Sequence, residues 1–481
     1  MCGVAGVFHK QAEQDVEMML RKLIHRGSNG QVIKNLPSAT LGHIRLATID
    51  SESEQQPVGR EDTWITFDGE IYNNRELTRE YLNSEPLQTR SDAEVVLYLY
   101  RKLGPRCVEL LDGTFAFAVV DGKEFFMARD ALGIKPVYCG TAHHAFYFAS
   151  EIKALSEITN TIHEFPPGHW FHSRMGWHAY FNINWISESV HSETDAIKSL
   201  RTVLQEAVRK RSLSEAPVGV SLSGDMESSI IAMLIKQENT QVQSFSVGEE
   251  GSEDLAATRK IAATLGVQHH EHAYTQREIL GALPKIIYHL ESFDPTLVRS
   301  AIPNFFLAEL ASQYVKVILT SEGAAEICAG HDYLGSIESH EELQNELINI
   351  TSSLHNTELQ RTDRIHMAFG LTARVPFLDM KLMTLAWRLP AKHILWRAFR
   401  DDFPKEILNS QKQKYSKETG ASDMIIERAE HEVSDTEFHS ESTRLLNRWG
   451  YRLPNKETLF YYRILRQYYE DRWIFPIMGF N

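Results

Sequence analysis

The sequence predicts two domains: an α+β domain of stacked antiparallel sheets with helices, then an α/β domain with a doubly wound parallel sheet. Three observations predict this. The 481 residues are too many for one typical core. Residues 1 to about 185 contain short apolar segments between turn residues, whereas strand and helix patterns alternate afterwards. A polar stretch over 186–194 separates the halves, so we place the domains at 1–186 and 195–481.

In the first half, the expected strands are short and one expected helix is long. An apolar pattern predicts the helix over Ser91–Leu103. The segments expected to form strands are Val4–Phe8, Ala39–Ile49, Trp64–Phe67, Phe115–Val120, Glu124–Ala128 and Ala145–Ala149. Turns between such strands favour antiparallel sheets, with the helix on the outside.

In the second half, strands and helices alternate, and this is the pattern of a doubly wound sheet. The expected strands are Val218–Leu222, Val242–Val247 and Val315–Thr320. The expected helices are Asp195–Lys210, Ser228–Lys236 and Leu255–Leu265. From about residue 340 onward the pattern is mostly helical.

Composition and charge narrow the class of function. Hydrophobic residues make up 43% and charged residues 24%, as in a soluble globular enzyme. The net charge of −14 argues against nucleic acid as a partner. No stretch reaches the ~18 apolar residues of a membrane span, and the N-terminus lacks a secretory signal pattern. Four cysteines without CxxC pairing indicate a reducing compartment, so we expect a cytoplasmic protein.

Cys2 is the first candidate for catalysis. Removal of Met1 would leave Cys2 at the N-terminus, with its own α-amine beside the thiol. This amine has an unperturbed pKa of about 7.7–8, so it can accept the thiol proton at neutral pH. A nucleophile paired with an N-terminal amine is suited to acyl transfer. The alternative is an ordinary small residue that opens a buried strand.

Two loops that follow predicted strands indicate a nucleotide site. The loop Ser223–Ser229 leads into a helix, and its small residues expose backbone N–H groups to a phosphate, although a plain turn has the same composition. The loop Thr320–Glu326 would lie beside it if the two strands are neighbours. The carboxylates of Glu227, Glu322 and Glu326 could hold Mg²⁺.

Over nearly its full length, the chain resembles the glutamine-dependent asparagine synthetase family. The first half is similar to its class II glutamine amidotransferase domain, of the N-terminal nucleophile hydrolase type, and the second half to its ATP pyrophosphatase synthetase domain. The matching segments are Met1-Cys2-Gly3, His25-Arg26-Gly27, Arg45–Asp50, Gly69–Asn73, Ser91–Glu94, Ala128–Pro136, Ser244–Gly248, His269–Glu271, Ala373–Asp379 and Gln411-Lys412.

The resemblance implies a glutaminase reaction in the first domain. Cys2 would attack the side-chain carbonyl of glutamine, release ammonia and leave a thioester. Asp68 and Gly69 stand at the positions of the oxyanion hole. Arg45 would bind the α-carboxylate of glutamine and Asp92 its α-ammonium.

In the second domain, the resemblance implies that aspartate reacts with ATP and that ammonia, arriving through an internal tunnel, displaces AMP. Glu322 would act as the base toward ammonia, and Lys412 would stabilise charge on the phosphate. Glu227 would hold Mg²⁺. The residues implied in ATP binding are Ser223, Gly224, Ser228, Ser229, Val247, Ser321 and Gly323. The tract His269–His272 matches a family segment that is not a metal site. The resemblance also makes a homodimer possible.

The chain departs from the family pattern in three motifs. The family's Ser-Gly-Gly-x-Asp-Ser-Ser loop here has Asp225 for its second Gly and Glu227 for its Asp. At ~4 Å and an effective dielectric near 20, a carboxylate at Asp225 would repel a phosphate by roughly 4 kcal/mol. Ala325 replaces a carboxylate expected on Mg²⁺, and Asp225 could supply that charge instead. Asp68 replaces the oxyanion-hole Asn, so it would donate only if it were protonated.

Three functions therefore stay open. We favour an ATP-dependent amide ligase acting on aspartate or another carboxylic acid, because Arg45, Asp92 and Lys412 are kept. The second is an amidase that uses Cys2 without ATP. The third is a regulatory or binding relative without catalytic activity.

Overall fold

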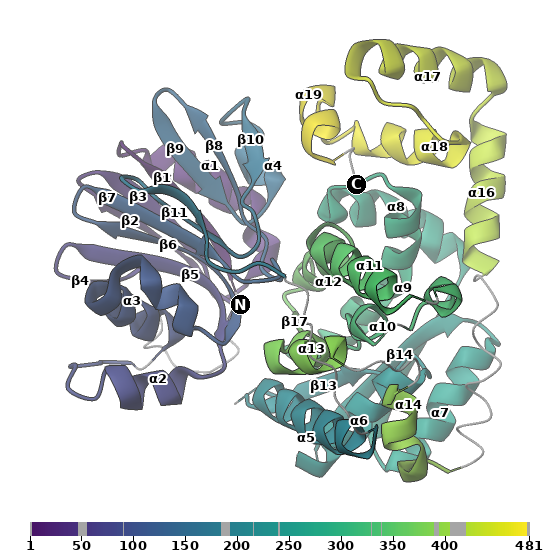
Figure 1. Cartoon of the computed structure of the whole chain (residues 1–481). Coiled ribbons are helices and arrows are strands. Elements are labelled where there is room, and N and C mark those ends of the chain that lie inside the picture. Colours follow the sequence, from purple (N-terminus) through teal and green to yellow (C-terminus); the bar gives the residue numbers. More distant parts are fainter. Residues whose placement is uncertain are drawn as a thin grey trace. The chain divides into compact units, whose positions relative to one another are not determined.

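The computed structural model describes residues 2–46, 55–89, 91–183, 193–214, 216–238, 241–328, 330–337, 339–388, 394–404 and 420–478 (Figure 1). The chain divides into two compact units. The first comprises Met1–Asn182, Met367–Gly370 and Arg466–Asn481, and the second comprises Ile183–His366 and Leu371–Leu465. The first unit thus includes two late segments of the chain, which a division into 1–186 and 195–481 does not foresee.

The first unit contains two six-stranded sheets in which all paired strands are antiparallel. In spatial order, the first sheet consists of β10 (Ile162–Glu164), β8 (Tyr138–Ala142), β9 (Ala145–Ala149), β1 (Gly3–Phe8), β3 (Ala39–Ile44) and β2 (Gln31–Leu36). The second consists of β12 (Gly176–Ala179), β11 (His169–His172), β7 (Glu124–Arg129), β6 (Gly113–Asp121), β5 (Thr63–Ile71) and β4 (Val58–Arg60). These sheets confirm the predicted class of the N-terminal domain.

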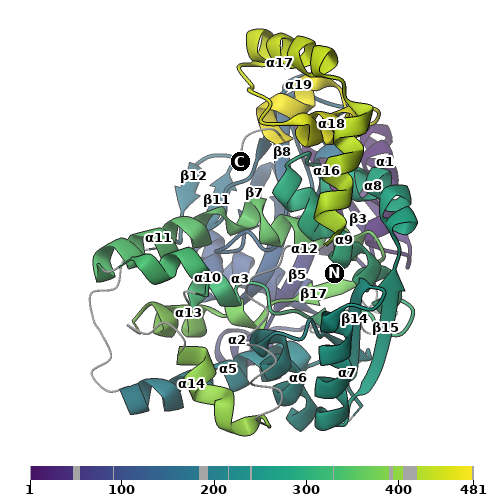
Figure 2. The ribbon, with the colours of Figure 1, turned by 90° about the vertical axis from the view of Figure 1, so that its right-hand side faces the viewer.

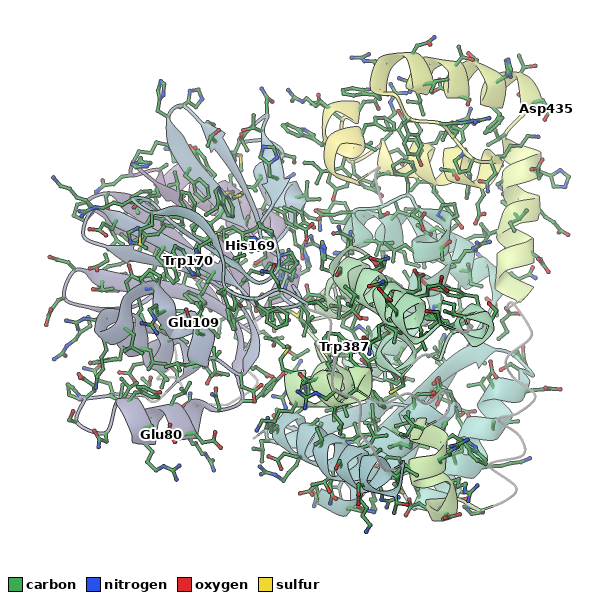
Figure 3. All side chains as sticks on the ribbon, in the orientation of Figure 1. Glu80, Glu109, His169, Trp170, Trp387 and Asp435 are labelled. Carbon is green, nitrogen blue, oxygen red and sulfur yellow. The ribbon has the colours of Figure 1, made fainter. Side chains whose placement is uncertain are left out.

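The two sheets stack on each other and carry helices on their outer faces. The helices of this unit are α1 (Glu13–Lys22), η1 (Ile24–Arg26), α2 (Asn74–Tyr81), α3 (Asp92–Leu103), η2 (Gly104–Leu110), α4 (Ile152–Leu155), α19 (Asp471–Trp473) and η7 (Ile474–Met478). On β6, Ala116 and Ala118 face the core between the sheets, while Phe115 and Phe117 face the core under α3. Trp170 of β11, labelled in Figure 3, belongs to that second core. Because both faces of β6 are covered, its sequence is apolar from Phe115 to Val120.

The second unit contains one parallel sheet of five strands. In spatial order these are β15 (Gln268–Tyr274), β14 (Gln243–Glu249), β13 (Val218–Ser221), β16 (Val317–Leu319) and β17 (Thr372–Arg374). From β13 the chain first builds outward through β14 and β15 and then returns to add β16 and β17 on the other side. This order confirms the predicted doubly wound sheet, and it makes β13 and β16 neighbours.

Helices cover this sheet, and Figure 2 shows α7 beside β14 and β15. Among the described residues of the unit, the α-helices are α5 (Glu193–Ser212), α6 (Met226–Glu238), α7 (Glu253–Leu265), α8 (Gln276–Leu290), α9 (Pro295–Ala311), α10 (Ala324–Ile327), α11 (His340–Ser353), α12 (Glu358–Met367), α13 (Met380–Trp387), α14 (Ile394–Phe399), α16 (Gly420–Glu432), α17 (Asp435–Trp449) and α18 (Lys456–Leu465). The short 3₁₀ helices are η3 (Asp332–Ser336), η4 (Leu354–Asn356), η5 (Pro376–Leu378) and η6 (Arg400–Asp402). The three helices predicted in the second half correspond to α5, α6 and α7, and their ends differ from the predicted ones by at most two residues. The described residues after 340 are mostly helical, as predicted.

Candidate functional site

Cys2 lies directly before β1, the strand that runs between β3 and β9 of the first sheet. Its side chain is 8% exposed. The backbone N–H of Cys2 donates to Asp68 Oδ1 at 2.8 Å. The structure therefore brings together two residues, Cys2 and Asp68, that the sequence proposed for one site but that are 66 positions apart.

Asp68 belongs to a buried chain of ion pairs. Arg26 Nη2 lies 3.1 Å from Asp68 Oδ2, and Arg26 Nη1 lies 2.8 Å from Glu151 Oε1. Glu151 also pairs with Lys153 and accepts from His25 Nε2 at 3.0 Å. Arg26, Asp68 and Glu151 have no exposed surface. Two carboxylates and two permanent cations balance in charge, which is the condition under which buried ions are tolerated.

The contacts of Asp68 bear on the role that the sequence assigns to it. Both carboxylate oxygens act as acceptors, one for the Cys2 N–H and the other for the Arg26 guanidinium. An ionised carboxylate paired in this way has no hydrogen to give to an oxyanion. Whether Asp68 serves in an oxyanion hole therefore stays a prediction.

The Cys2 thiol is acidic for a cysteine. Burial raises its pKa, but His43 and the positive charge of the N-terminus lower it by more, and the net change is from 9.0 to about 7. His43 is buried on β3, opposite Val4 of β1. Because the thiolate is the nucleophilic form, the lowered pKa favours a reactive Cys2 at neutral pH. Sequence reasoning missed His43, since nothing local marks a histidine inside a strand as a partner of Cys2.

Selective alkylation tests this acidity. We expect iodoacetamide to modify Cys2 with a pH midpoint of about 7. Burial raises the pKa values of Cys107, Cys139 and Cys328, so these thiols should stay unmodified at neutral pH. The rate for each cysteine is measured by mass spectrometry of its peptide.

The matched variant for this measurement is His43→Gln. It should move the Cys2 midpoint upward, because it removes a contribution that lowers the thiol pKa. His178→Gln, a change on β12 of the other sheet, serves as the control and should leave the midpoint where it is. An unchanged midpoint in His43→Gln would show that His43 does not activate Cys2.

The two residues expected to bind glutamine lie near this centre. Arg45 follows β3, and its backbone N–H donates to the Gly30 carbonyl at 2.9 Å. Asp92 is the first residue of α3, and it accepts from the Ile71 backbone N–H at 2.9 Å, at the end of β5. Asp92 is thereby tied to the strand that carries Asp68. Their roles in binding glutamine stay predictions.

Gly69 is a glycine for a steric reason. Its φ is +149°, and a Cβ at this position would lie 2.1 Å from the Thr114 carbonyl oxygen on the neighbouring strand β6. Any side chain would therefore push β5 and β6 apart. The close packing fixes the Asp68–Gly69 peptide in the sheet, which suits the expected use of its N–H toward an oxyanion.

In the second unit, the two predicted loops leave neighbouring parallel strands. Val218 of β13 pairs with Val317 of β16, so residues 222–225 and 320–323 follow strands that end side by side. Ser246 on β14 donates its hydroxyl to the Leu222 carbonyl and connects a third strand to the first loop. Val247 is the next residue of β14. The point at which strand order reverses is where such sheets bind ligands.

Asp225 lies in the loop that the sequence assigns to a phosphate. It directly precedes α6, and its Oδ1 accepts from the Ser228 backbone N–H at 2.7 Å. Its Oδ2 accepts from the Ser223 hydroxyl at 2.5 Å. The Ser229 hydroxyl donates to the Asp225 carbonyl, also at 2.5 Å. These three donors of the loop thus bind Asp225, and they are not available to a phosphate while its side chain stays in this position.

Acidic groups surround the start of α6. Burial, together with the charges of Asp225 and Glu326, raises the pKa of Glu227 to about 7. Glu326 is 6% exposed and lies 3.1 Å from His331 Nε2. Among the described residues, no group of three or more His, Cys, Asp or Glu side chains is arranged to hold a metal ion. Glu227 thus has an acidic setting but no completed set of ligands for Mg²⁺.

The second loop holds Glu322 in an ion pair. Its Oε2 lies 2.8 Å from Arg361 Nη2 on α12. Burial raises the pKa of Glu322, although Arg361 opposes the rise. Gly323 has φ +88°, and a Cβ there would lie 2.3 Å from Leu378 Cδ2. Ser321 accepts on its carbonyl from Ala324 N–H at 3.1 Å, which closes the turn into α10.

Two further expectations concern Lys412 and the histidine tract. Lys412 lies outside the described residues, so its predicted role stays untested. His269–His272 form part of the edge strand β15, where His269 Nδ1 lies 2.9 Å from Ser244 Oγ and His270 Nε2 lies 2.9 Å from Gln243 Oε1.

Within the described ranges, no helix is long and apolar enough to cross a membrane.

Comparison with known proteins agrees with this architecture. The family model described as glutamine amidotransferase domain matches residues 1–201, and the model described as asparagine synthase matches residues 199–345 and 335–473. A probable glutamine-hydrolysing asparagine synthetase of Schizosaccharomyces pombe is 35% identical, over 97% of this chain and 93% of its own length. Asparagine synthetase B of Escherichia coli K12 is 33% identical, over 96% of this chain and 90% of its own. Two domain matches and an identity of this degree over nearly both whole chains show that this protein belongs to the asparagine synthetase family of glutamine-hydrolysing amidotransferases.

Proposed function

We propose that this chain is a glutamine-dependent amide ligase, which releases ammonia from glutamine at Cys2 and uses it to amidate aspartate or another carboxylic acid. The observation that carries the proposal is the acidic Cys2 thiol beside the buried Asp68–Arg26–Glu151 chain of ion pairs. The asparagine synthase domain implies ATP as the second substrate. The same proposal includes three further points: ATP binds together with Mg²⁺, the chain forms a homodimer, and the protein is cytoplasmic.

The glutaminase chemistry follows from the contacts of Cys2. When Met1 is removed, the nitrogen that now donates to Asp68 becomes an α-ammonium, and the hydrogen bond becomes an ion pair. This pair favours the charged amine, which stabilises the neighbouring thiolate. The thiolate attacks the amide carbon of glutamine and forms a thioester. The ammonium gives its proton to the departing nitrogen, which leaves as ammonia, and water then hydrolyses the thioester to glutamate.

A second function, a glutaminase that does not depend on ATP, is favoured by one observation. The Asp225 carboxylate already occupies the donors at the start of α6. With these donors occupied, the synthetase domain would not bind nucleotide and the Cys2 reaction would run alone.

Product analysis separates the two functions. We expect the protein to form AMP and pyrophosphate from ATP and Mg²⁺ when aspartate and ammonium are supplied without glutamine. When glutamine is the substrate, we expect the chain to release glutamate. Cys2→Ala should abolish this release, and Cys107→Ala, a change of another buried cysteine, should not affect it. Glutamate release without AMP formation from any carboxylic acid tried would contradict the ligase and support the glutaminase.

A further inference from the structure

The carboxylate of Asp225 makes the contacts that a phosphate would make at the end of β13. It accepts one backbone N–H at the start of α6, from Ser228 at 2.7 Å, and one hydroxyl, from Ser223 at 2.5 Å. Backbone N–H groups at a helix start, joined by nearby hydroxyls, are the usual partners of phosphate oxygens. Both groups lie in the loop at which the strand order of the sheet reverses.

We propose that Asp225 is a built-in competitor of the nucleotide phosphates: nucleotide binds only when the Asp225 side chain leaves the start of α6. This proposal rests on the proposed ligase function, which requires a nucleotide in this domain. It adds a residue that sets how tightly this chain binds nucleotide, and it explains how the loop can keep Ser223, Ser228 and Ser229 and still not fit a phosphate.

Charge and geometry support competition rather than shared occupancy. A phosphate at the Ser228 N–H would meet the Asp225 carboxylate at hydrogen-bond distance, and like charges at such a distance repel strongly. Burial, and then the charges of Asp225 and Glu326, raise the pKa of Glu227, so a phosphate would add to an existing repulsion among acidic groups. Gly224 has φ +85°, which lets the chain turn sharply from the strand into the loop.

An ordinary helix cap is the alternative, and the chain contains a matched example. Asp294 precedes α9 and accepts from the Leu297 backbone N–H at 2.8 Å, which is the same cap geometry as at Asp225. Asp294 follows no strand of the parallel sheet, since it lies between α8 and α9. Removing its charge should therefore change the stability of a helix but not the binding of nucleotide.

Direct binding tests the proposal. The full chain, Asp225→Gly, Asp225→Asn and the control Asp294→Asn are titrated with ATP and Mg²⁺ by calorimetry, and with pyrophosphate by thermal shift. We expect Asp225→Gly to bind ATP at least about tenfold more tightly than the unmodified chain. Asp225→Asn keeps a helix cap without the charge, so it should show a smaller gain. Asp294→Asn should bind like the unmodified chain.

The outcomes separate this proposal from the proposed function. If both Asp225 variants bind ATP no more tightly than the unmodified chain, Asp225 is not a competitor, even when AMP formation shows that the chain is a ligase. If Asp225→Gly gains binding but forms no AMP with any acid, the competition stands and the ligase function fails. If Asp225→Gly does not fold, as judged by circular dichroism, Asp225→Asn decides by the same criterion.

Discussion

Replacing Asp68 by Asn is expected to raise the rate of glutamine hydrolysis by about 10²- to 10³-fold, the usual effect of one oxyanion-hole donor. In the structure both oxygens of Asp68 are acceptors, for the Cys2 nitrogen and for Arg26. An Asn side chain would keep one acceptor oxygen and add two N–H donors. It would also remove a negative charge that opposes the developing oxyanion next to Cys2, and we expect this gain to exceed the loss of the ion pair between Asp68 and the Cys2 α-amine.

The measurement is kcat for glutamate release at saturating glutamine. Asp121→Asn is the matched control, because Asp121 lies on β6 of the same sheet and accepts from the Thr63 hydroxyl at 3.0 Å, away from Cys2. Its kcat should equal that of the unmodified chain. A folded Asp68→Asn variant with the same or a lower kcat would show that the Asp68 carboxylate does not limit the reaction.

The strand and helix patterns of the sequence were sufficient for the fold class but not for every element. Helix α1 was not predicted, although Val16, Met19, Leu20 and Leu23 repeat at helical spacing and are all buried. Strand β15 was not predicted because its sequence, Gln268–Tyr274, is polar, as an edge strand with mostly exposed or half-buried residues can be. The predicted strand Ala39–Ile49 ends at Ile44 as β3, and Ala47–Ile49 lie outside the described residues.

In the candidate site, too, residues marked by their sequence neighbours could be predicted, and residues brought in by strand pairing could not. Cys2 could be proposed from its place beside Met1 alone, and the neighbouring loops of the second domain from the strands before them. The partners of Cys2 could not, because Asp68 and His43 reach it only through the pairing of strands distant in sequence. The sequence predicted that the charge of Asp225 repels a phosphate, but it did not predict that Asp225 caps α6. An Asp directly before a helix is a signal for such a cap, and sequence analysis could have used it.

The ion pairs around Arg26 predict the second large effect, on stability. Arg26→Met should lower the free energy of unfolding of the first unit by about 3–5 kcal/mol, the usual cost of removing one partner of a buried ion pair. Arg26 has no exposed surface and pairs with Asp68 and Glu151, and its Nε donates to the Cys2 carbonyl at 3.0 Å. Met fills a similar length of the same space, so the loss would reflect charge and hydrogen bonding more than volume.

Cys107 provides a probe that reports on the first unit alone. It is buried in that unit, and burial raises its pKa, so it should react with iodoacetamide only when the unit opens. The urea dependence of Cys107 alkylation in the full chain therefore measures the stability of this unit. Arg101→Met is the matched control, since Arg101 pairs at 2.7 Å with Glu61, which is 71% exposed, and surface pairs contribute only about 0–1 kcal/mol. Equal losses in the two variants would mean that the buried pairs of Arg26 stabilise the unit no more than a surface pair does. A much larger loss of unfolding free energy in Arg26→Met would show that the buried ion pairs of Arg26 with Asp68 and Glu151, which contact Cys2, also stabilise the first unit.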